Sequence, residues 1–314
     1  MKLIKDLREG MRVAEVYLCK TRQIQLTKNG KEYCSVTLQD KSGSIDGKIW
    51  DLGNPGIGNF EARDFVFVDA DVSIFNNNPQ LRINRIRKAE AGEYTESDYL
   101  PVSARDIGAM YDELLTLVNS VKNKDLSRLL KAFFVEDPKF IEKYKFSSAA
   151  KSVHHGFVGG LLEHSLGVAK LCNYMCGAYP YLKHDLLISV ALLHDIGKIR
   201  EITPYPDNDY SDEGQLLGHI VIGCEMIGEK IKQLPDFNPK LESEIKHCIL
   251  AHHGEFEYGS PKKPALAEAM ALNLADNTDA KVEIMKELLD AAGENNGWLG
   301  YNKLLESNVR RTQM

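Results

Sequence analysis

The hydrophobic pattern of this chain changes its period once, near residue 90. Between residues 11 and 88, five extended stretches are separated by turn signals such as Asn29-Gly30 and Asp40-Lys41-Ser42-Gly43. After residue 101, apolar residues recur with the 3.6-residue period of helices. A chain of 314 residues is long enough for two domains. The change of period therefore predicts a multidomain α+β protein, with a β domain followed by a helical one.

Five strands without a helix among them predict a small barrel, and the leading candidate is the oligonucleotide-binding barrel. Its binding face would be flanked by the loops Thr27–Lys31 and Phe75–Pro79. If exposed, the rings of Tyr33, Trp50 and Phe75 would stack on the bases of a single strand. Each of these rings, taken alone, is equally consistent with a place in the core.

The polar stretch EAGEYTESDYLP, residues 90–101, reads as a linker. We predict a barrel over residues 1–90, a linker and helical connector over 91–148, a helical bundle over 149–292 and a C-terminal tail over 293–314. The expected helices lie near residues 104–121, 124–134, 157–177, 183–198, 214–232, 239–252 and 264–291.

The net charge of −6 is unevenly distributed: residues 1–90 hold 15 Lys+Arg and 12 Asp+Glu, and residues 91–314 hold 24 and 33. The total argues against a broad basic nucleic-acid surface, but the barrel is the part better suited to a polyanion. No apolar stretch reaches the ~18 residues of a membrane span, and the N-terminus is charged. The six cysteines form no CxxC pair. We therefore expect a cytoplasmic protein without membrane contact.

Ligand-type side chains recur on the apolar faces of several predicted helices. The stretch LLHDIGK, residues 192–198, closes an apolar run that begins at Leu186. Isolated charges in such a run cost several kcal/mol unless they are paired or bind a metal. A lone histidine on an apolar face is more often a hydrogen-bonded core residue. Because the pattern recurs on four or five helices, it favours a metal site between them. These residues are His164, His194, Asp195, His219, His252 and Asp276.

The order of these residues resembles that of the HD-domain metal-dependent phosphohydrolase superfamily, named for its adjacent His-Asp. The resemblance covers about residues 149–292 and runs through His164, His194-Asp195, Lys198, His219, His252-His253 and Asp276. With the barrel in front, and with the stretch HHGFVGGLLEH, the whole chain resembles the YhaM family of bacterial 3′-to-5′ exoribonucleases.

The resemblance implies two divalent transition-metal ions. Asp195 would bridge them, since a carboxylate has two oxygens. Manganese is the metal that the resemblance indicates, and mixed His and Asp ligation also suits Fe, Co, Ni or Zn. Some three-metal relatives carry a glutamate at the position of Gly160, so we expect two ions at most. The first ion would be held by His164, His194, Asp195 and Asp276, and the second by His219, His252, His253 and Asp195.

Asp195 and Lys198 are the expected catalytic residues, and Lys198 would also bind the substrate by stabilising its phosphoryl oxygens. The alternative for Lys198 is a snorkelling side chain at a helix end. His154 and His155 are candidates for protonating the leaving 3′ oxygen or holding substrate, and a supporting role is equally open. Asp279, one turn past Asp276, is a candidate for supporting a ligand.

Three functions remain open. The preferred one is a 3′-to-5′ exonuclease that acts on single-stranded RNA, or also DNA, and releases nucleoside 5′-monophosphates. The second is an HD-type phosphohydrolase of a small nucleotide, such as a dNTP, an alarmone or a cyclic dinucleotide. The third is a nucleic-acid-binding regulator with a structural metal. The oligomeric state is left open.

Overall fold

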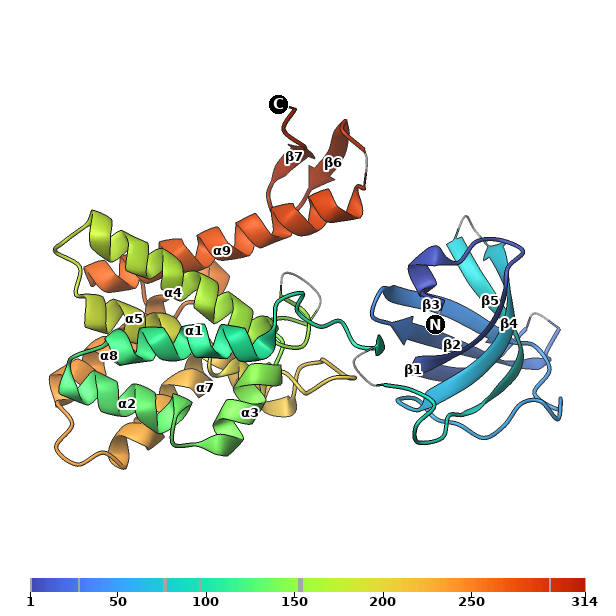
Figure 1. Ribbon diagram of the computed structural model, residues 1–314, viewed down its shortest axis with the longest axis horizontal. Coiled ribbons are helices and arrows are strands. Elements are labelled where there is room, and N and C mark those ends of the chain that lie inside the picture. Colours follow the sequence, from blue (N-terminus) through green and yellow to red (C-terminus); the bar gives the residue numbers. More distant parts are fainter. Residues whose placement is uncertain are drawn as a thin grey trace. The chain divides into compact units, whose positions relative to one another are not determined.

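The computed structural model describes residues 2–27, 29–75, 78–95, 98–151, 155–293 and 295–313. The chain divides into two compact units, one comprising residues 1–102 with 205–207, and the other residues 103–204 with 208–314. Strands build the first unit and helices dominate the second (Figure 1). The predicted α+β class is therefore confirmed. The exact boundaries at residues 90, 148 and 292 stay predictions.

The first unit is a closed barrel whose strands follow the order β1-β2-β3-β5-β4, and β4 pairs back with β1. Neighbouring strands are antiparallel except β3 and β5, which are parallel. This is the arrangement of an oligonucleotide-binding-like barrel. The strands are β1 Arg12–Leu26, β2 Glu32–Asp40, β3 Gly43–Ile49, β4 Phe65–Phe75 and β5 Asn78–Lys88.

Alternation along the strands fills the barrel interior. In β4, the buried residues Val66, Val68, Ala70 and Val72 are separated by residues that are more exposed. This is the period of a strand with one face toward a core. A register shift in β1 between Cys19 and Thr21 interrupts the ladder with β2, and such a bulge bends a long strand.

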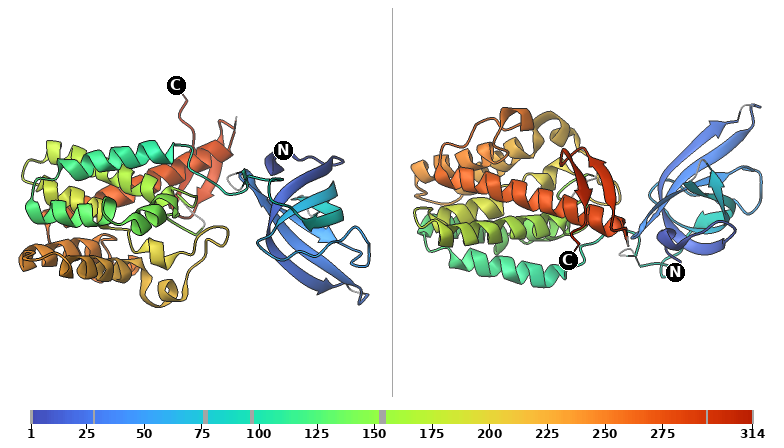
Figure 2. Two further views of the ribbon diagram at one scale, coloured as in Figure 1. Left: turned by 60° about the horizontal axis from the view of Figure 1, so that its bottom comes forward. Right: turned by 90° about the horizontal axis from the view of Figure 1, so that it is seen from above.

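The second unit is a helical bundle with a small hairpin after its last helix. Figure 2 shows this hairpin at the C-terminal end of α9 from two directions. The elements are α1 Ile107–Ser120, α2 Lys124–Phe134, α3 Pro138–Phe146, α4 Gly160–Ala178, α5 His184–Leu193, α6 Lys198–Glu201, α7 Asp212–Lys232, α8 Pro239–Ala251, α9 Ala267–Ala291, β6 Trp298–Asn302 and β7 Ser307–Arg310.

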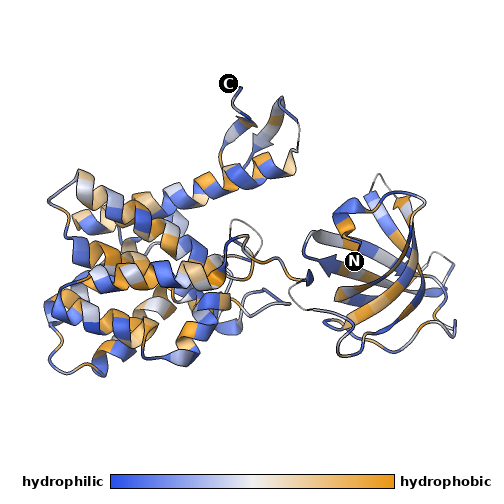
Figure 3. Cartoon of the chain, viewed as in Figure 1, coloured by the Kyte–Doolittle hydropathy of each residue, from blue (hydrophilic) through white to orange (hydrophobic). Residues whose placement is uncertain are grey.

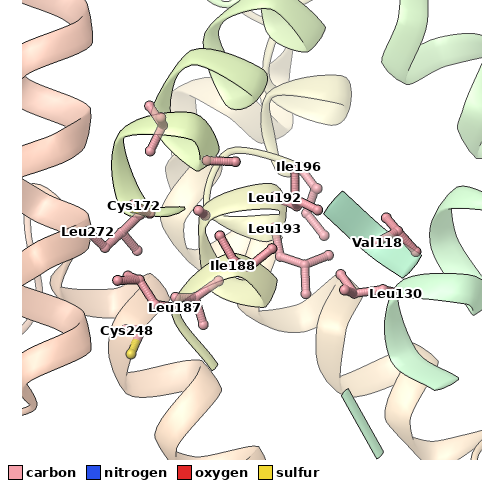
Figure 4. Packing of buried hydrophobic residues seen from close by; sticks show 14 of the residues in the cluster. Val118, Leu130, Cys172, Leu187, Ile188, Leu192, Leu193, Ile196, Cys248 and Leu272 are labelled. Atoms are coloured by element: carbon pink, nitrogen blue, oxygen red, sulfur yellow. The ribbon is translucent and has the colours of Figure 1, made fainter. Parts of the chain in front are cut away.

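Helix α5 is the centre of this bundle. All residues from Leu186 to Leu193 are buried, and α5 packs against α1, α2, α4, α8 and α9. Figure 4 shows Leu187, Ile188 and Leu192 within the shared core. A helix that is apolar all round belongs in a core, whereas α1, α4 and α9 carry both hydrophobic and hydrophilic residues (Figure 3). In the described part of the chain, no helix is long and apolar enough to cross a membrane.

Three details of the helical unit differ from the expectation. The helix predicted to run to Lys198 ends at Leu193, and residues 194–197 form a turn before α6. Helix α3 was not predicted, and it joins the same core as the helices that follow, as do α1 and α2. The predicted tail contains the strands β6 and β7.

Candidate metal centre

Side chains from five parts of the bundle converge where α5 ends. His164 comes from α4, His219 from α7 and Asp276 from α9, while His194 and Asp195 lie in the turn that follows α5. The fifth part is the end of α8, which contributes the pair His252 and His253. The structure therefore brings together all seven residues that the sequence analysis predicted as metal ligands.

The first group of candidate ligands is His164, His194 and Asp276. The Nε2 atoms of His164 and His194 lie 3.2 Å apart. Asp276 Oδ1 lies 3.2 Å from His164 Nε2 and 3.9 Å from His194 Nε2. These distances allow one small cation to contact all three atoms.

The second group is His219, His252 and His253, whose candidate ligand atoms all lie within 4.8 Å of one another. Imidazole is a common ligand of divalent transition metals. Burial lowers the pKa of His252 well below its usual value, with His253 adding to the effect. Burial likewise lowers the pKa of His253, with His219 adding to it. Both rings are therefore neutral at pH 7 and able to bind a metal.

Asp195 lies between the two groups and faces each with one oxygen. Its Oδ2 is 3.4 Å from the Nε2 atoms of both His164 and His194. Its Oδ1 is 3.5 Å from His219 Nε2 and 3.7 Å from His252 Nε2. A carboxylate in this position can contact a cation on either side.

The five histidines of these groups use Nδ1 to hydrogen-bond within the protein. A donated Nδ1 proton fixes the tautomer and leaves the Nε2 lone pair for the centre. The acceptors are Asp279 Oδ2 for His164, Ala191 O for His194, Glu201 Oε1 for His219, Ile249 O for His252 and Tyr258 O for His253, at 2.7–2.9 Å.

Several buried polar atoms at this point have no hydrogen-bond partner within the part of the protein that the structure describes. Among the described residues, Asp195 Oδ1, His219 Nε2 and His252 Nε2 are buried without a hydrogen-bond partner. Buried polar atoms without a partner are costly. The Nε2 atoms of His164 and His194 also face each other at this point, 3.2 Å apart. The side chains present therefore fit divalent metal ions.

A third group of candidate ligands is explained by hydrogen bonds alone. Asp279 Oδ2 lies 3.1 Å from His155 Nε2 and 2.8 Å from His164 Nδ1. Burial would raise the pKa of Asp279, but the hydrogen bonds from His155 and His164 lower it to about 2. Asp279 thus supports His164 from behind, as the sequence analysis considered.

Lys198 lies against the carboxylate that faces both groups, with its Nζ 2.7 Å from Asp195 Oδ2. Burial disfavours the charge of Asp195, but Lys198 and His194 outweigh it and hold the pKa of the carboxyl well below its usual range. Burial also opposes the charge of Lys198, and Asp195 overcomes it and raises the pKa of the ammonium. Both groups therefore stay charged.

Two glycines, Gly197 and Gly218, let the turn that carries Asp195 and the part of α7 that carries His219 approach each other closely. A Cβ on Gly197, in the turn after Asp195, would lie 2.0 Å from the carbonyl oxygen of His219. Gly218, at φ 74° and ψ 156°, breaks the helical path of α7 just before His219. Glycine adopts such a positive φ without strain. The backbone of His219 can therefore sit directly on the turn that carries Asp195.

The other predicted residues have different surroundings. His154 lies outside the described residues. His155 is only 2% exposed and lies behind His164, so its position suits support of that ligand better than contact with substrate. A Cβ at Gly160 would lie 1.9 Å from the carbonyl oxygen of His155, so no glutamate fits there.

Two further residues, Glu201 and Asn273, support ligands without having been predicted from the sequence. Glu201 accepts hydrogen bonds from His219, and Asn273 Nδ2 donates to the carbonyl oxygen of His252 at 2.7 Å. Their helix positions were a usable signal, because Glu201 lies one turn past Lys198 and Asn273 one turn before Asp276.

One groove on the barrel is lined by all three of the predicted aromatic residues, Tyr33, Trp50 and Phe75. Tyr33 and Trp50 stack with ring centroids 4.8 Å apart, and Trp50 and Phe75 are 45% and 61% exposed. The groove has a volume of about 440 Å³ and is also lined by Lys48, Asp46, Asn78, Pro79 and Gln80. Lys48 Nζ lies 5.9 Å from the centroid of the Tyr33 ring. The groove thus combines exposed rings with a cation.

Comparison with known proteins shows the family to which this sequence belongs. The sequence profile of the HD domain family matches residues 161–281. Two proteins named 3′-5′ exoribonuclease YhaM, from Listeria monocytogenes serotype 4b (strain F2365) and serovar 1/2a (strain ATCC BAA-679 / EGD-e), are each 31% identical over 289 residues. Each match covers 92% of this chain and 91% of the relative.

Among solved structures, the second OB-fold domain of replication protein A from Methanococcus maripaludis is similar to 29% of this chain. The match covers 96% of that domain, with 20% sequence identity and a TM-score of 0.21. The Listeria proteins, in contrast, align along almost the whole chain. The chain belongs to the YhaM family, and its helical unit contains an HD domain.

Proposed function

We propose that this protein is a metal-dependent exonuclease that removes nucleotides from the 3′ end of single-stranded RNA and releases nucleoside 5′-monophosphates. The observation that carries the proposal is the position of Asp195, with one oxygen toward each of two imidazole groups. The substrate and the direction are supported by the relatives that are named 3′-5′ exoribonucleases. Single-stranded DNA is a second substrate to compare.

The proposed cofactors are two divalent transition-metal ions, with manganese as the first choice and Fe, Co, Ni and Zn as alternatives. Once bound, such ions supply Lewis acidity to the phosphoryl group and lower the pKa of a water molecule. His164, His194 and Asp276 would hold one ion, and His219, His252 and His253 the other. Asp195 would contact both.

Lys198 is proposed to work on the substrate as well as on Asp195. An ammonium has three N–H donors, and Asp195 takes one of them. The side chain of Lys198 is 13% exposed, whereas that of Asp195 is 2% exposed. Lys198 can therefore donate to a phosphoryl oxygen where charge develops. His155 is assigned to orienting His164 through Asp279, in place of protonating the leaving oxygen.

The barrel groove is proposed to hold the strand. Stacking on Tyr33, Trp50 and Phe75 tolerates any base, and Lys48 adds an attraction for the phosphates. This division of labour fits the charge distribution, since residues 1–90 are basic and residues 91–314 are acidic overall.

A time course with end-labelled strands tests the proposal. With manganese, a 3′-labelled RNA should release its label as a mononucleotide at the start, and a 5′-labelled RNA should shorten stepwise. A blocked 3′ end should prevent both, and Asp195→Asn should abolish them. Intact strands together with hydrolysis of a dNTP or an alarmone would show a small-nucleotide phosphohydrolase instead.

A further inference from the structure

The geometry points to a second contact surface for single-stranded nucleic acid on the β6–β7 hairpin, within the helical unit. This inference rests on the proposed substrate and adds a binding site apart from the barrel groove. The surface consists of the outer face of the hairpin, defined by Trp298, Tyr301, Asn308 and Arg310.

The register of the hairpin places two aromatic rings on one face. Trp298 pairs with Arg310 and Tyr301 pairs with Asn308, and residues that pair across strands share a face. Arg310 and Asn308 are two residues apart and lie on the same face, and the register shift between Trp298 and Gly300 lets Trp298 and Tyr301 share it. Val309, between Asn308 and Arg310, is only 2% exposed and points to the other side. Trp298 and Tyr301 are 66% and 65% exposed. Two large rings thus face solvent together.

The hairpin is held in place by its inner face. A two-stranded hairpin alone is marginally stable, so it needs packing against another element. Val309 is buried, and Arg311 Nη2 donates a hydrogen bond of 2.6 Å to the carbonyl oxygen of Leu289 in α9. The aromatic face is therefore not needed to anchor the hairpin.

The positive charge of the hairpin favours a negatively charged polymer as its partner. Arg310 Cζ lies 5.7 Å from the centroid of the Trp298 ring. Residues 298–311 carry Lys303, Arg310 and Arg311 against one acid, Glu306, whereas residues 91–314 hold 24 basic and 33 acidic residues. The hairpin is thus a basic and aromatic element on an acidic unit. Single-strand binding proteins combine stacking rings with basic side chains in this way.

Helix α9 connects the hairpin to the metal centre. Its residues Asp276 and Asp279 belong to the centre, and further along Lys286 lies near Glu163 and Glu287 near His155. The helix therefore runs past the start of α4 and ends at the hairpin (Figure 1). From Asp276 to Ala291 it spans roughly 22 Å. An extended strand of several nucleotides with its 3′ end at the centre can reach this distance.

The chain offers a direct reporter, because it contains two tryptophans, Trp50 in the barrel groove and Trp298 on the hairpin. In the full-length Trp50→Phe variant, Trp298 is the only source of tryptophan emission. A long oligouridylate with a 5′ fluorescein, added in the presence of a chelator, should quench this emission. The quenching should saturate at the concentration at which the fluorescein anisotropy saturates.

Saturating anisotropy with unchanged Trp298 emission would overturn the inference and leave the proposed substrate intact. Absence of binding in both signals, in this variant and in the unmodified chain, would overturn the inference and the proposed substrate together.

Matched variants separate stacking from other roles of the hairpin. Trp298→Ala should weaken strand binding roughly tenfold, while Trp298→Phe, which keeps a ring, should retain most of the affinity. Tyr174→Ala, which removes a 76% exposed ring from α4, is the control and should change little. If Trp298→Ala instead dissociates an oligomer in sedimentation velocity and leaves strand binding unchanged, the face is a subunit interface and the inference is wrong.

Discussion

Glu201 Oε1 accepts two hydrogen bonds from His219, one from the backbone N–H and one from Nδ1, each 2.9 Å long. Burial opposes the charge of Glu201, but the bonds from His219 outweigh it and lower the pKa of the carboxyl. Glu201 therefore fixes both the position and the tautomer of His219. It does so without facing the centre itself.

Removing Glu201 should weaken metal binding. We expect Glu201→Ala to reduce manganese affinity about 10- to 100-fold, the usual effect of losing the partner of a metal-binding histidine. Isothermal titration of the metal-free protein measures this. Glu213→Ala, which breaks a more exposed pair with Arg200, should leave the affinity near that of the unmodified protein. Equal affinities in both variants would show that Glu201 does not orient His219.

The close contact at Gly197 predicts a large effect from a single methyl group. In Gly197→Ala, the Cβ would meet the carbonyl oxygen of His219 at 2.0 Å and the nitrogen of Gly223 at 2.7 Å, so the backbone must move. We expect a loss of about 1–3 kcal/mol in the free energy of unfolding, or more, together with weaker metal binding.

Gly177→Ala is the matched control, because its Cβ would have open space near the end of α4. This substitution should be neutral or stabilise the protein by up to about 1 kcal/mol. Urea denaturation of both variants provides the comparison. Similar midpoints for the two would contradict the close packing of α7 on the turn.

The low pKa of Asp279 predicts how stability depends on pH in the metal-free protein. Since the folded-state pKa is about 2 and an unfolded aspartate has a higher value, the unfolded chain binds the proton first as the pH falls. The contribution of Asp279, about 2 kcal/mol, is fully present above pH ~4 and disappears toward pH ~2.

The unfolding free energies of the unmodified protein and of Asp279→Asn should therefore differ most above pH ~4 and converge below it. Denaturation in chelator across this pH range measures the difference. Asp112→Asn, on the exposed side of α1, should give a curve parallel to that of the unmodified protein. A difference for Asp279→Asn that stays constant with pH would rule out this ionic role.

The stacked rings of the barrel groove predict a loss of strand affinity. Trp50→Ala should weaken binding of single-stranded RNA by about 1–3 kcal/mol, the usual contribution of one stacked base. Anisotropy in the presence of a chelator separates binding from hydrolysis. Tyr181→Ala, which removes a 66% exposed ring from the helical unit, is the control. Unchanged affinity for Trp50→Ala would argue that the strand binds elsewhere.

Much of the candidate site could be predicted because helix periodicity marks buried faces. His164 and His252 stand on apolar stripes, and a stripe that is buried brings its polar members inside with it. The barrel was predictable for the same kind of reason, since alternation and the Asn29-Gly30 turn are local signals. These features depend on neighbours within a few residues.

The contact between Glu201 and His219 depends on distant segments of the chain. The position of Glu201 one turn past Lys198 is a local signal, but its contact with His219 requires α6 and α7 to meet through Gly197 and Gly218, which no local pattern encodes. Helix α3, in contrast, has a local start signal that the prediction did not use. Asp137 caps the helix and Pro138 occupies its first turn. The hairpin strands are short, and a register shift between Trp298 and Gly300 interrupts their alternation.

Anomalous diffraction from crystals grown with manganese tests the two-metal centre most directly. If two ions bind as proposed, two peaks should lie about 3.5–4 Å apart. One should lie beside His164 and His194, the other beside His219 and His252, and Asp195 should contact both. A single peak, no peak, or peaks that do not contact Asp195 would contradict the proposed two-metal centre.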